Sequence, residues 1–582
     1  MMTTLLPKQN GSNALSPLAL QFSKFMAGKI EGEVNQIILL TLALLAERNI
    51  SGDVCIDLGS LSGKPLFDSE TVPMDTTAPD LKVWIQQLLD TGCVGIPGEQ
   101  QPVIIDQNRL YLYQFWNDEL CVAKQLLNRS KQTVNLDEPR LESMLERLFS
   151  DSDRSESQRK AAALCCRHSF AVVSGGPGTG KTTTIVKILS LLLDQNSDMR
   201  ISLAAPTGKA AAHMLESIRT RSLEQPLSHT LLEALPDKAS TLHRLLGAGR
   251  GGYQFNQENP INTDCLIIDE ASMLDISMTR RVLEALPDHA RLILLGDRDQ
   301  LASVAAGNVL ADITGQGHNP VSASITFRDS IAFLDTSFRF DDESHIGRLA
   351  AAVNAGNTDD VYHLLKSENE SLNWYRSDTD KLDTLAMEWA IKHYQQVFNA
   401  NNLEEALSNY ESFRVLCAQH SGALGVEAVN QLLTDHFLRA GLINNPDNFR
   451  GQPLLITQNY HDLDLFNGDT GLVWPDENGH LRAWFRARDQ SLRSLSLSII
   501  PKINTAWAMT VHKSQGSEFD NILLLLPPTN DSALLNRSLI YTAITRTRQN
   551  FRIQSSISSL ALACMRTTSR QSGLAGKLGW VL

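Results

Sequence analysis

The chain has 582 residues, 42% of them hydrophobic and 20% charged, which is typical of a globular protein with sizeable cores. At about 150 residues per domain, this length corresponds to three or four domains. The 52 Lys and Arg residues against 65 Asp and Glu give a net charge of −13, which excludes a protein that coats nucleic acid with its whole surface, so any nucleic-acid site must be a local groove.

Neither membrane insertion nor secretion is indicated. The longest apolar run near the start, residues 37–46, is too short to cross a bilayer. The first 30 residues lack the basic and apolar segments of a secretory signal. The eight cysteines include no C-x-x-C pair, which favours reduced thiols without a zinc ribbon or an iron–sulfur site. We therefore expect a soluble, cytoplasmic protein that does not contact a membrane.

A mainly helical N-terminal domain is predicted over residues 1–115. Helical patterns over 18–46 and 80–89 precede two short strands at 103–105 and 110–112. The sequence GIPG at 95–98 resembles the turn of a DNA-gripping helix-hairpin-helix, but the strands that follow favour an ordinary turn. Residues 1–110 are acidic and carry no phosphate or metal motif, which favours a docking role and partner contacts there.

Two α/β domains are predicted after this region, over 116–340 and 341–582. β-branched or leucine-rich runs alternate with helical stretches from residue 157, and this alternation predicts parallel sheets buried on both faces. The expected strands are 171–174, 201–205, 265–268 and 292–295 in the first domain, and 414–418 and 522–526 in the second. The turn-rich stretch 451–498 predicts a small β module inserted into the second domain.

A phosphate-binding loop follows the first of these strands. The sequence GGPGTGKTTT from Gly175 fits G-x-x-x-x-G-K-[ST] and precedes a helix expected over about 182–193. Backbone N–H groups of such a loop, with the helix N-terminus, bind phosphate oxygens. A glycine-rich loop with a stray lysine is the alternative. The predicted nucleotide-binding residues are Gly175, Gly176, Pro177, Gly178, Thr179, Gly180, Lys181, Thr182 and Thr183.

Two further strand ends carry the groups that hydrolysis requires. Asp269, at the end of one strand, is expected to hold Mg²⁺ together with Thr182, and Glu270 to orient or deprotonate the attacking water. Gln300 follows another strand and could contact both the γ-phosphate and the water. Cation density on the γ-phosphate is often supplied by an arginine from across a cleft. Arg339 and Arg546 are the candidates, although an isolated arginine is more often a surface residue.

Taken together, the motifs resemble superfamily-one helicases of the RecD-like branch. The resemblance covers about residues 157–550, and its most specific strings are HKSQGSE and GDRDQLASV. The other matching strings are SQRKAA, GGPGTGKTTT, APTGKAA, TLH, IIDEASM, SFRF and YTAITRTR. This resemblance implies two RecA-like motor domains, with an SH3-like barrel at 451–498 and a strand-separating hairpin within 245–262. A glycine-rich surface loop is the alternative for the hairpin.

The same resemblance assigns roles to individual residues. Lys181, Thr182, Asp269 and Glu270 form the ATPase centre, Gln300 senses the γ-phosphate, and Arg339 and Arg546 complete the site. Gln158 corresponds to a glutamine that reads adenine, although a lone glutamine before a helix is usually a surface residue. The residues implied to hold single-stranded DNA are Pro206, Thr207, Lys209, Thr241 and His243 in the first domain, and Thr510, His512, Lys513 and Ser514 in the second.

The implied function is an ATP- and Mg²⁺-dependent 5′-to-3′ DNA translocase and helicase. It would act with RecB-like and RecC-like subunits in a RecBCD (exonuclease V) complex during recombinational repair of double-strand breaks. Residue chemistry alone does not give the direction of movement. Two alternatives stay open: a stand-alone RecD-like helicase, and an assembly or regulatory subunit whose ATP site is structural.

Overall fold

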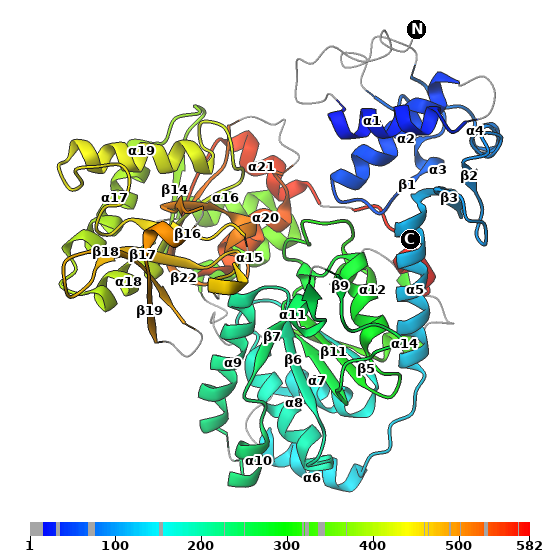
Figure 1. Ribbon diagram of the computed structural model, residues 1–582, viewed down its shortest axis with the longest axis horizontal. Coiled ribbons are helices and arrows are strands. Elements are labelled where there is room, and N and C mark those ends of the chain that lie inside the picture. The colour runs from blue at the N-terminus through cyan, green and yellow to red at the C-terminus, as the bar shows by residue number, and fades with distance from the viewer. Residues whose placement is uncertain are drawn as a thin grey trace.

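The structure is a computed structural model (Figure 1). It describes residues 15–30, 35–67, 76–149, 155–225, 227–249, 251–316, 319–320, 325–335, 344–367, 369–458, 460–463, 465–487, 491–500, 502–528, 534–567 and 570–581. Within these ranges, no helix has the length and apolar character needed to cross a membrane.

The N-terminal region combines short helices with a four-stranded sheet of order β1-β4-β3-β2. The helical pattern expected over 18–46 forms two helices rather than one, because the Asn35 side chain accepts a hydrogen bond from the N–H of Ile37 and starts a second helix. The two predicted strands are confirmed as β3 and β4. The elements are α1 (Pro17–Ala27), α2 (Gln36–Ile50), β1 (Cys55–Asp57), α3 (Leu58–Leu61), α4 (Leu81–Leu89), β2 (Val94–Gly95), β3 (Val103–Asp106) and β4 (Arg109–Leu112).

The first α/β region contains a parallel sheet of order β13-β5-β11-β10-β6-β7. Alternate residues of each central strand enter different cores: Val172 faces one cluster, whereas Ala171 and Val173 face the other. Both faces of the sheet are therefore covered, as the sequence predicts. Its strands are β5 (Phe170–Gly175), β6 (Ile201–Ala205), β7 (Ala239–Thr241), β10 (Cys265–Ile268), β11 (Arg291–Gly296) and β13 (Ile331–Leu334).

The helices of this region lie before and between its strands, singly or in succession. They are α5 (Tyr113–Ser130), α6 (Glu138–Leu148), α7 (Glu156–Arg167), α8 (Lys181–Gln195), α9 (Gly208–Leu223), α10 (His229–Ala234), α11 (Leu242–Leu245), α12 (Ile276–Ala285), α13 (Val309–Ile313) and α14 (Ile325–Arg328). A two-stranded hairpin, β8 (Ala248–Gly249) and β9 (Gly252–Tyr253), lies within the stretch 245–262. Its role in strand separation stays a prediction.

The second α/β region contains a parallel sheet of order β14-β23-β22-β15-β21. Its strands are β14 (Leu372–Arg376), β15 (Phe413–Cys417), β21 (Ala508–Thr510), β22 (Phe519–Leu525) and β23 (Thr547–Ser555). Its helices are α15 (His345–Ala355), α16 (Thr358–Lys366), α17 (Thr384–Asn399), α18 (Leu403–Ser412), α19 (Val426–Arg439), α20 (Arg537–Thr545) and α21 (Ile557–Met565). The α/β fold with two parallel sheets is thus confirmed.

A five-stranded antiparallel sheet of order β19-β18-β17-β16-β20 is inserted between β15 and β21. It has a hydrophobic core of its own, which includes Val473 and Phe485. Its last strand lies beyond the expected end at 498. The strands are β16 (Pro453–Leu455), β17 (Thr470–Pro475), β18 (Leu481–Arg486), β19 (Leu492–Leu495) and β20 (Asn504–Thr505).

The C-terminal segment 570–581 leaves the second sheet and returns to the start of the chain, whereas the second domain was expected to run to residue 582. The carbonyl of Gln571 accepts from the N–H of Val54 at 2.8 Å. Strand β24 (Trp580–Val581) pairs with β12 (Asn319–Pro320), after the short helix α22 (Leu574–Lys577). Figure 1 shows this end of the chain beside α5. The segment therefore joins the N-terminal and first α/β regions.

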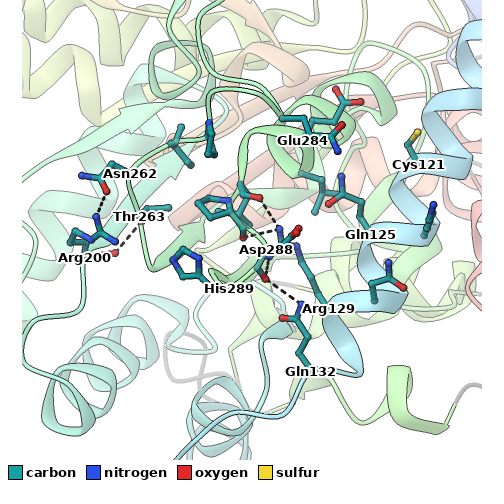
Figure 2. A pocket seen from close by; sticks show the side chains of 18 residues that line it. Cys121, Gln125, Arg129, Gln132, Arg200, Asn262, Thr263, Glu284, Asp288 and His289 are labelled. Atoms are coloured by element: carbon teal, nitrogen blue, oxygen red, sulfur yellow. Dashed lines mark hydrogen bonds between the residues drawn. The ribbon is translucent and has the colours of Figure 1, made fainter.

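A cavity of about 750 Å³ lies between α5 and the loops that lead into β6, β10 and β11 (Figure 2). Arg129 of α5 is buried there and donates to the carbonyls of Ala290 at 2.7 Å and Leu286 at 2.9 Å. These contacts fasten α5 to the first α/β region. The cavity lies at the amino ends of the strands, whereas the phosphate loop follows the carboxyl end of β5.

Candidate active site

The predicted phosphate loop connects β5, which ends at Gly175, to α8, which begins at Lys181. Gly178 and Gly180 have φ of 78° and 76°, in the left-handed region where glycine carries no steric cost. The Lys181 Nζ donates to the carbonyls of Gly175 at 2.6 Å and Gly176 at 3.2 Å. Residues 176–180 therefore form a compact turn, and Lys181, Thr182 and Thr183 begin α8, with the Lys181 ammonium folded over the turn.

Gln158 supports this loop from α7. Its side chain is buried, and Nε2 donates to the carbonyl of Thr179 at 2.9 Å. The Thr179 hydroxyl in turn donates to the carbonyl of Gly176 at 2.8 Å. Gln158 is therefore not the surface residue of the alternative interpretation. Its contact with adenine stays a prediction.

The two predicted carboxylates follow β10 directly. Oδ1 of Asp269 accepts from the N–H of Glu270 at 2.8 Å, and Glu270 has a φ of 53°, which is uncommon outside glycine. Burial raises the pKa of Asp269 to about 6, the neighbouring Glu270 adds to the rise, and Lys181 opposes it. The Lys181 ammonium of the loop therefore interacts electrostatically with the Asp269 carboxylate.

The turn after β11 places Gln300 beside a carboxylate that the sequence analysis did not single out. Gln300 Nε2 donates to Oδ2 of Asp297 at 3.1 Å, and both side chains are buried. Burial raises the pKa of Asp297, and Lys181 opposes this rise. Asp297 follows the end of its strand directly, as Asp269 does, and this shared position is the signal that could have identified it.

Helix α20 of the second α/β region contacts the turn after β11. Arg546, at its C-terminal end, is buried and donates to Oε1 of Gln300, and its Nη1 lies 3.6 Å from Oε1 of Glu270. The N–H of Leu301 donates to Oγ1 of Thr542 at 2.9 Å. The structure therefore brings Arg546 together with the predicted catalytic groups. Arg339 lies outside the described residues.

The three threonines predicted to hold DNA share one local geometry. Thr207, Thr241 and Thr510 each follow or end a parallel strand, and each caps the helix that comes next. Their Oγ1 atoms accept backbone N–H groups at 3.2, 3.3 and 3.3 Å. Pro206 immediately precedes the first of them. These residues therefore lie at the carboxyl edges of the two sheets, and each hydroxyl proton remains able to donate to a phosphate.

Lys209 lies at a cleft of about 540 Å³ that the two α/β regions and the inserted sheet form together. Burial lowers the pKa of Lys209 to about 8, and the nearby Arg414 contributes to this decrease. Basic, aromatic and acidic side chains line the cleft, and some of the charges pair with one another, as in Arg548 with Glu518. The other lining residues with these side chains include Phe466, Asp469, Phe485, Arg486, Arg493, Phe519 and Asp520.

The remaining predicted DNA residues differ in how accessible they are. His243 is exposed, with its ring 6.2 Å from that of Tyr253 in the hairpin. His512 and Lys513 lie in a short 3-10 turn, and burial lowers the pKa of both. Ser514 is fully buried, and its hydroxyl donates to the carbonyl of Val511 at 2.7 Å. The Ser514 hydroxyl therefore stabilises the turn, and its contact with DNA stays a prediction.

Three family models match the chain. They are an AAA domain over residues 158–306, the N-terminal domain of the RecBCD enzyme subunit RecD over 11–111, and a UvrD-like helicase C-terminal domain over 505–553. The first covers the phosphate loop, both carboxylates and Gln300, and the last covers Arg546.

Curated relatives match over nearly the whole chain. The RecBCD enzyme subunit RecD of Haemophilus influenzae is 31% identical over 99% of each chain, and that of Mycobacterium tuberculosis is 34% identical over 94% of this chain and 92% of its own. The ATP-dependent RecD2 DNA helicase of Deinococcus radiodurans is 29% identical, but this chain spans only 50% of its length. A solved Pif1 helicase from Bacteroides matches 74% of this chain and 95% of its own at 17% identity and a TM-score of 0.38. The chain therefore belongs to the RecD subunit family and is an ATP-dependent DNA helicase.

Proposed function

We propose that the chain is the 5′-to-3′ motor subunit of a RecBCD-type complex, with RecB-like and RecC-like partners, and that it unwinds duplex ends during recombinational repair of double-strand breaks. The observation that carries the motor role is the contact of Arg546, from the second α/β region, with Gln300 and Glu270 of the first. ATP bound between these groups adds favourable contacts only when the cleft is closed. Hydrolysis removes those contacts, so each turnover opens and closes the two regions.

The chain's own groups have distinct parts in the proposed hydrolysis. Lys181 neutralises phosphate charge, and Glu270 orients the attacking water and takes up its proton. Gln300 and Arg546 contact the γ-phosphate as negative charge develops on it. The adjacent charges of Lys181, Glu270 and Arg546 are consistent with this assignment.

The chemistry of two residues at this site fits a Mg²⁺ ion. Thr182 and Asp269 would hold it, because hard divalent cations prefer oxygen ligands and Asp269 is a buried carboxylate beside Glu270. When bound, the ion would supply positive charge that offsets the negative charge of the phosphates.

The proposed DNA path follows the carboxyl edges of the two sheets. Thr207 and Thr241 lie on the first region, and Thr510, His512 and Lys513 on the second. Hydroxyl and ammonium groups contact phosphates without reading sequence, which suits a motor that must move over any DNA. A change in the distance between the two regions would then move the protein along the strand.

Two observations weigh against the alternatives. A structural ATP site does not need a buried arginine that reaches a water-activating carboxylate from a separate region. A stand-alone helicase is disfavoured because the RecD subunits described above match 94–99% of this chain, whereas the RecD2 helicase matches 71% of it. The match of residues 11–111 to the RecD N-terminal model supports partner docking by the N-terminal domain.

Unwinding of tailed duplexes tests the proposal. The purified chain, alone and with RecB-like and RecC-like subunits, is given duplexes with a 5′ or a 3′ single-stranded tail. We expect ATP-dependent opening of the 5′-tailed duplex only, and no opening by Lys181→Gln. Opening of the 3′-tailed duplex by the chain alone contradicts the direction, and failure to co-purify with the two subunits contradicts the assembly.

A further inference from the structure

Tyr541 of helix α20 reaches the ATP site, but the mechanism above gives it no role. Its hydroxyl donates to Oδ2 of Asp297 at 3.0 Å, from the second α/β region to the first. The ring is largely buried, and a Cβ atom added to Gly176 of the phosphate loop would lie 3.0 Å from the hydroxyl oxygen. Tyr541 thus touches both the loop and the turn after β11.

Asp297 is the point where these contacts meet. Its Oδ1 accepts from the N–H of Asp299 at 3.1 Å, and its Oδ2 accepts both Gln300 Nε2 at 3.1 Å and the Tyr541 hydroxyl at 3.0 Å. A carboxylate oxygen has two lone pairs in its plane, so two donors on Oδ2 fix the rotation of the carboxylate. The Gln300 amide is then held at both ends, by Asp297 and by Arg546.

The electrostatics of the pair favour this direction of donation. Burial raises the pKa of Tyr541 well above its ordinary value, and the negative Asp297 and Asp299 add to the rise, so the hydroxyl keeps its proton. Burial also raises the pKa of Asp297, whereas the hydrogen bond from Tyr541 opposes that rise. The tyrosine therefore helps to keep the buried carboxylate ionised and accepting.

We propose that Tyr541 and Asp297 are positioning residues for ATP hydrolysis, which together orient the side chain of Gln300 when the two α/β regions close. This inference rests on the role assigned to Gln300 in the proposed function. The Tyr541 hydroxyl can reach Asp297 only while α20 lies against the turn, because the two residues belong to different regions. Closure of the cleft thus sets the geometry of Gln300, in addition to bringing Arg546 to it.

Steady-state ATP turnover of the full chain with saturating single-stranded DNA tests this inference. Tyr541→Phe removes one oxygen atom and should lower kcat by about 10- to 100-fold, because small misplacements of reacting groups have effects of this size. The KM for ATP should stay within about twofold, since the phosphate loop is unchanged. Tyr362→Phe is the matched control: it removes a hydroxyl that donates to the carbonyl of Ile557 at 2.9 Å in the same region, and should leave kcat unchanged.

A double variant tests whether the two residues act as one unit. Asp297→Asn should lower kcat by itself, and Asp297→Asn with Tyr541→Phe should be no worse than the more impaired single variant. The proposal is overturned if the losses of kcat in the two single variants multiply in the double variant. It is also overturned if Tyr541→Phe keeps a kcat within twofold of wild type, or if only its KM changes. If one variant fails to fold by circular dichroism, the kcat and KM of the other decide by the same criteria. Wild-type turnover that does not respond to DNA would instead contradict the proposed function.

Discussion

Replacement of Arg546 is the substitution whose effect follows most directly from the geometry. The guanidinium is buried, donates to Gln300 Oε1 and lies 3.6 Å from Oε1 of Glu270. An arginine that reaches a transferring phosphoryl group is worth 10³- to 10⁵-fold in kcat. We therefore expect Arg546→Ala to lower DNA-stimulated ATP turnover by about 10³-fold or more, which corresponds to about 4 kcal/mol of transition-state stabilisation.

The conservative substitution separates charge from geometry. Arg546→Lys keeps the charge but loses the planar fork that reaches two groups at once, so we expect a loss of about 10²-fold. The free energy of unfolding of Arg546→Lys should fall by only about 1–2 kcal/mol. The loss is limited because Glu270, which faces Arg546, remains partly exposed to solvent.

The assay for both variants is steady-state phosphate release with single-stranded DNA, together with circular dichroism to verify folding. Arg439→Ala is the matched control, since Arg439 is exposed on α19 and donates to the carbonyl of Asp435 at 3.2 Å. An Arg546→Ala chain that keeps more than a tenth of wild-type kcat would refute the reasoning.

Three further predictions concern DNA contacts and stability. Burial lowers the pKa of Lys209 to about 8, so its ammonium loses its proton as the pH rises from 7 to 9. The affinity for single-stranded DNA, measured by fluorescence anisotropy, should therefore fall over this range. The fall should be smaller in Lys209→Met. Replacing His512 and Lys513 together by Ala should reduce DNA-stimulated ATPase more than basal ATPase, whereas equal loss of both would contradict a DNA contact. Lys577→Met should destabilise the chain by about 3 kcal/mol, because it leaves the buried Glu119, now 2.8 Å from the ammonium, without a cation. Adding Glu119→Gln should restore much of the thermal midpoint, and no recovery would contradict this explanation.

Most of the fold could be predicted because the central strands have an unusually regular hydrophobic pattern. Leu523 and Leu525 enter one core while Ile522 and Leu524 enter another, so β22 is apolar on both faces and is recognisable as a buried parallel strand. The edge strands lack this signature. Strand β14, with Asn373 exposed, was accordingly not predicted.

The site was predictable where a residue type has one dominant chemical use. The loop glycines with Lys181, and the carboxylates Asp269 and Glu270, belong to this group, although their roles stay proposals. Asp297 follows its strand as Asp269 does, but its pairing with Tyr541 could not be identified, because the two residues are 244 positions apart. Sequence periodicity carries no information about such a distant pairing.

The path of residues 570–581 was unpredictable for the same reason. Arg570 donates to the carbonyls of Ala305 at 2.6 Å and Gly307 at 2.8 Å, just after the turn that holds Gln300. In the sequence, the segment is a short run of mixed polar and apolar residues that gives no sign of its partners. Only the folded chain shows that it connects the N-terminal sheet to the ATP site.

ATP turnover by the chain with and without single-stranded DNA, compared with that of Lys181→Gln, is the most direct test of the account. If the two α/β regions convert hydrolysis into movement, DNA should increase wild-type turnover at least severalfold, and the folded Lys181→Gln chain should hydrolyse no ATP under either condition. Turnover that ignores DNA, or that survives the loss of Lys181, would contradict it.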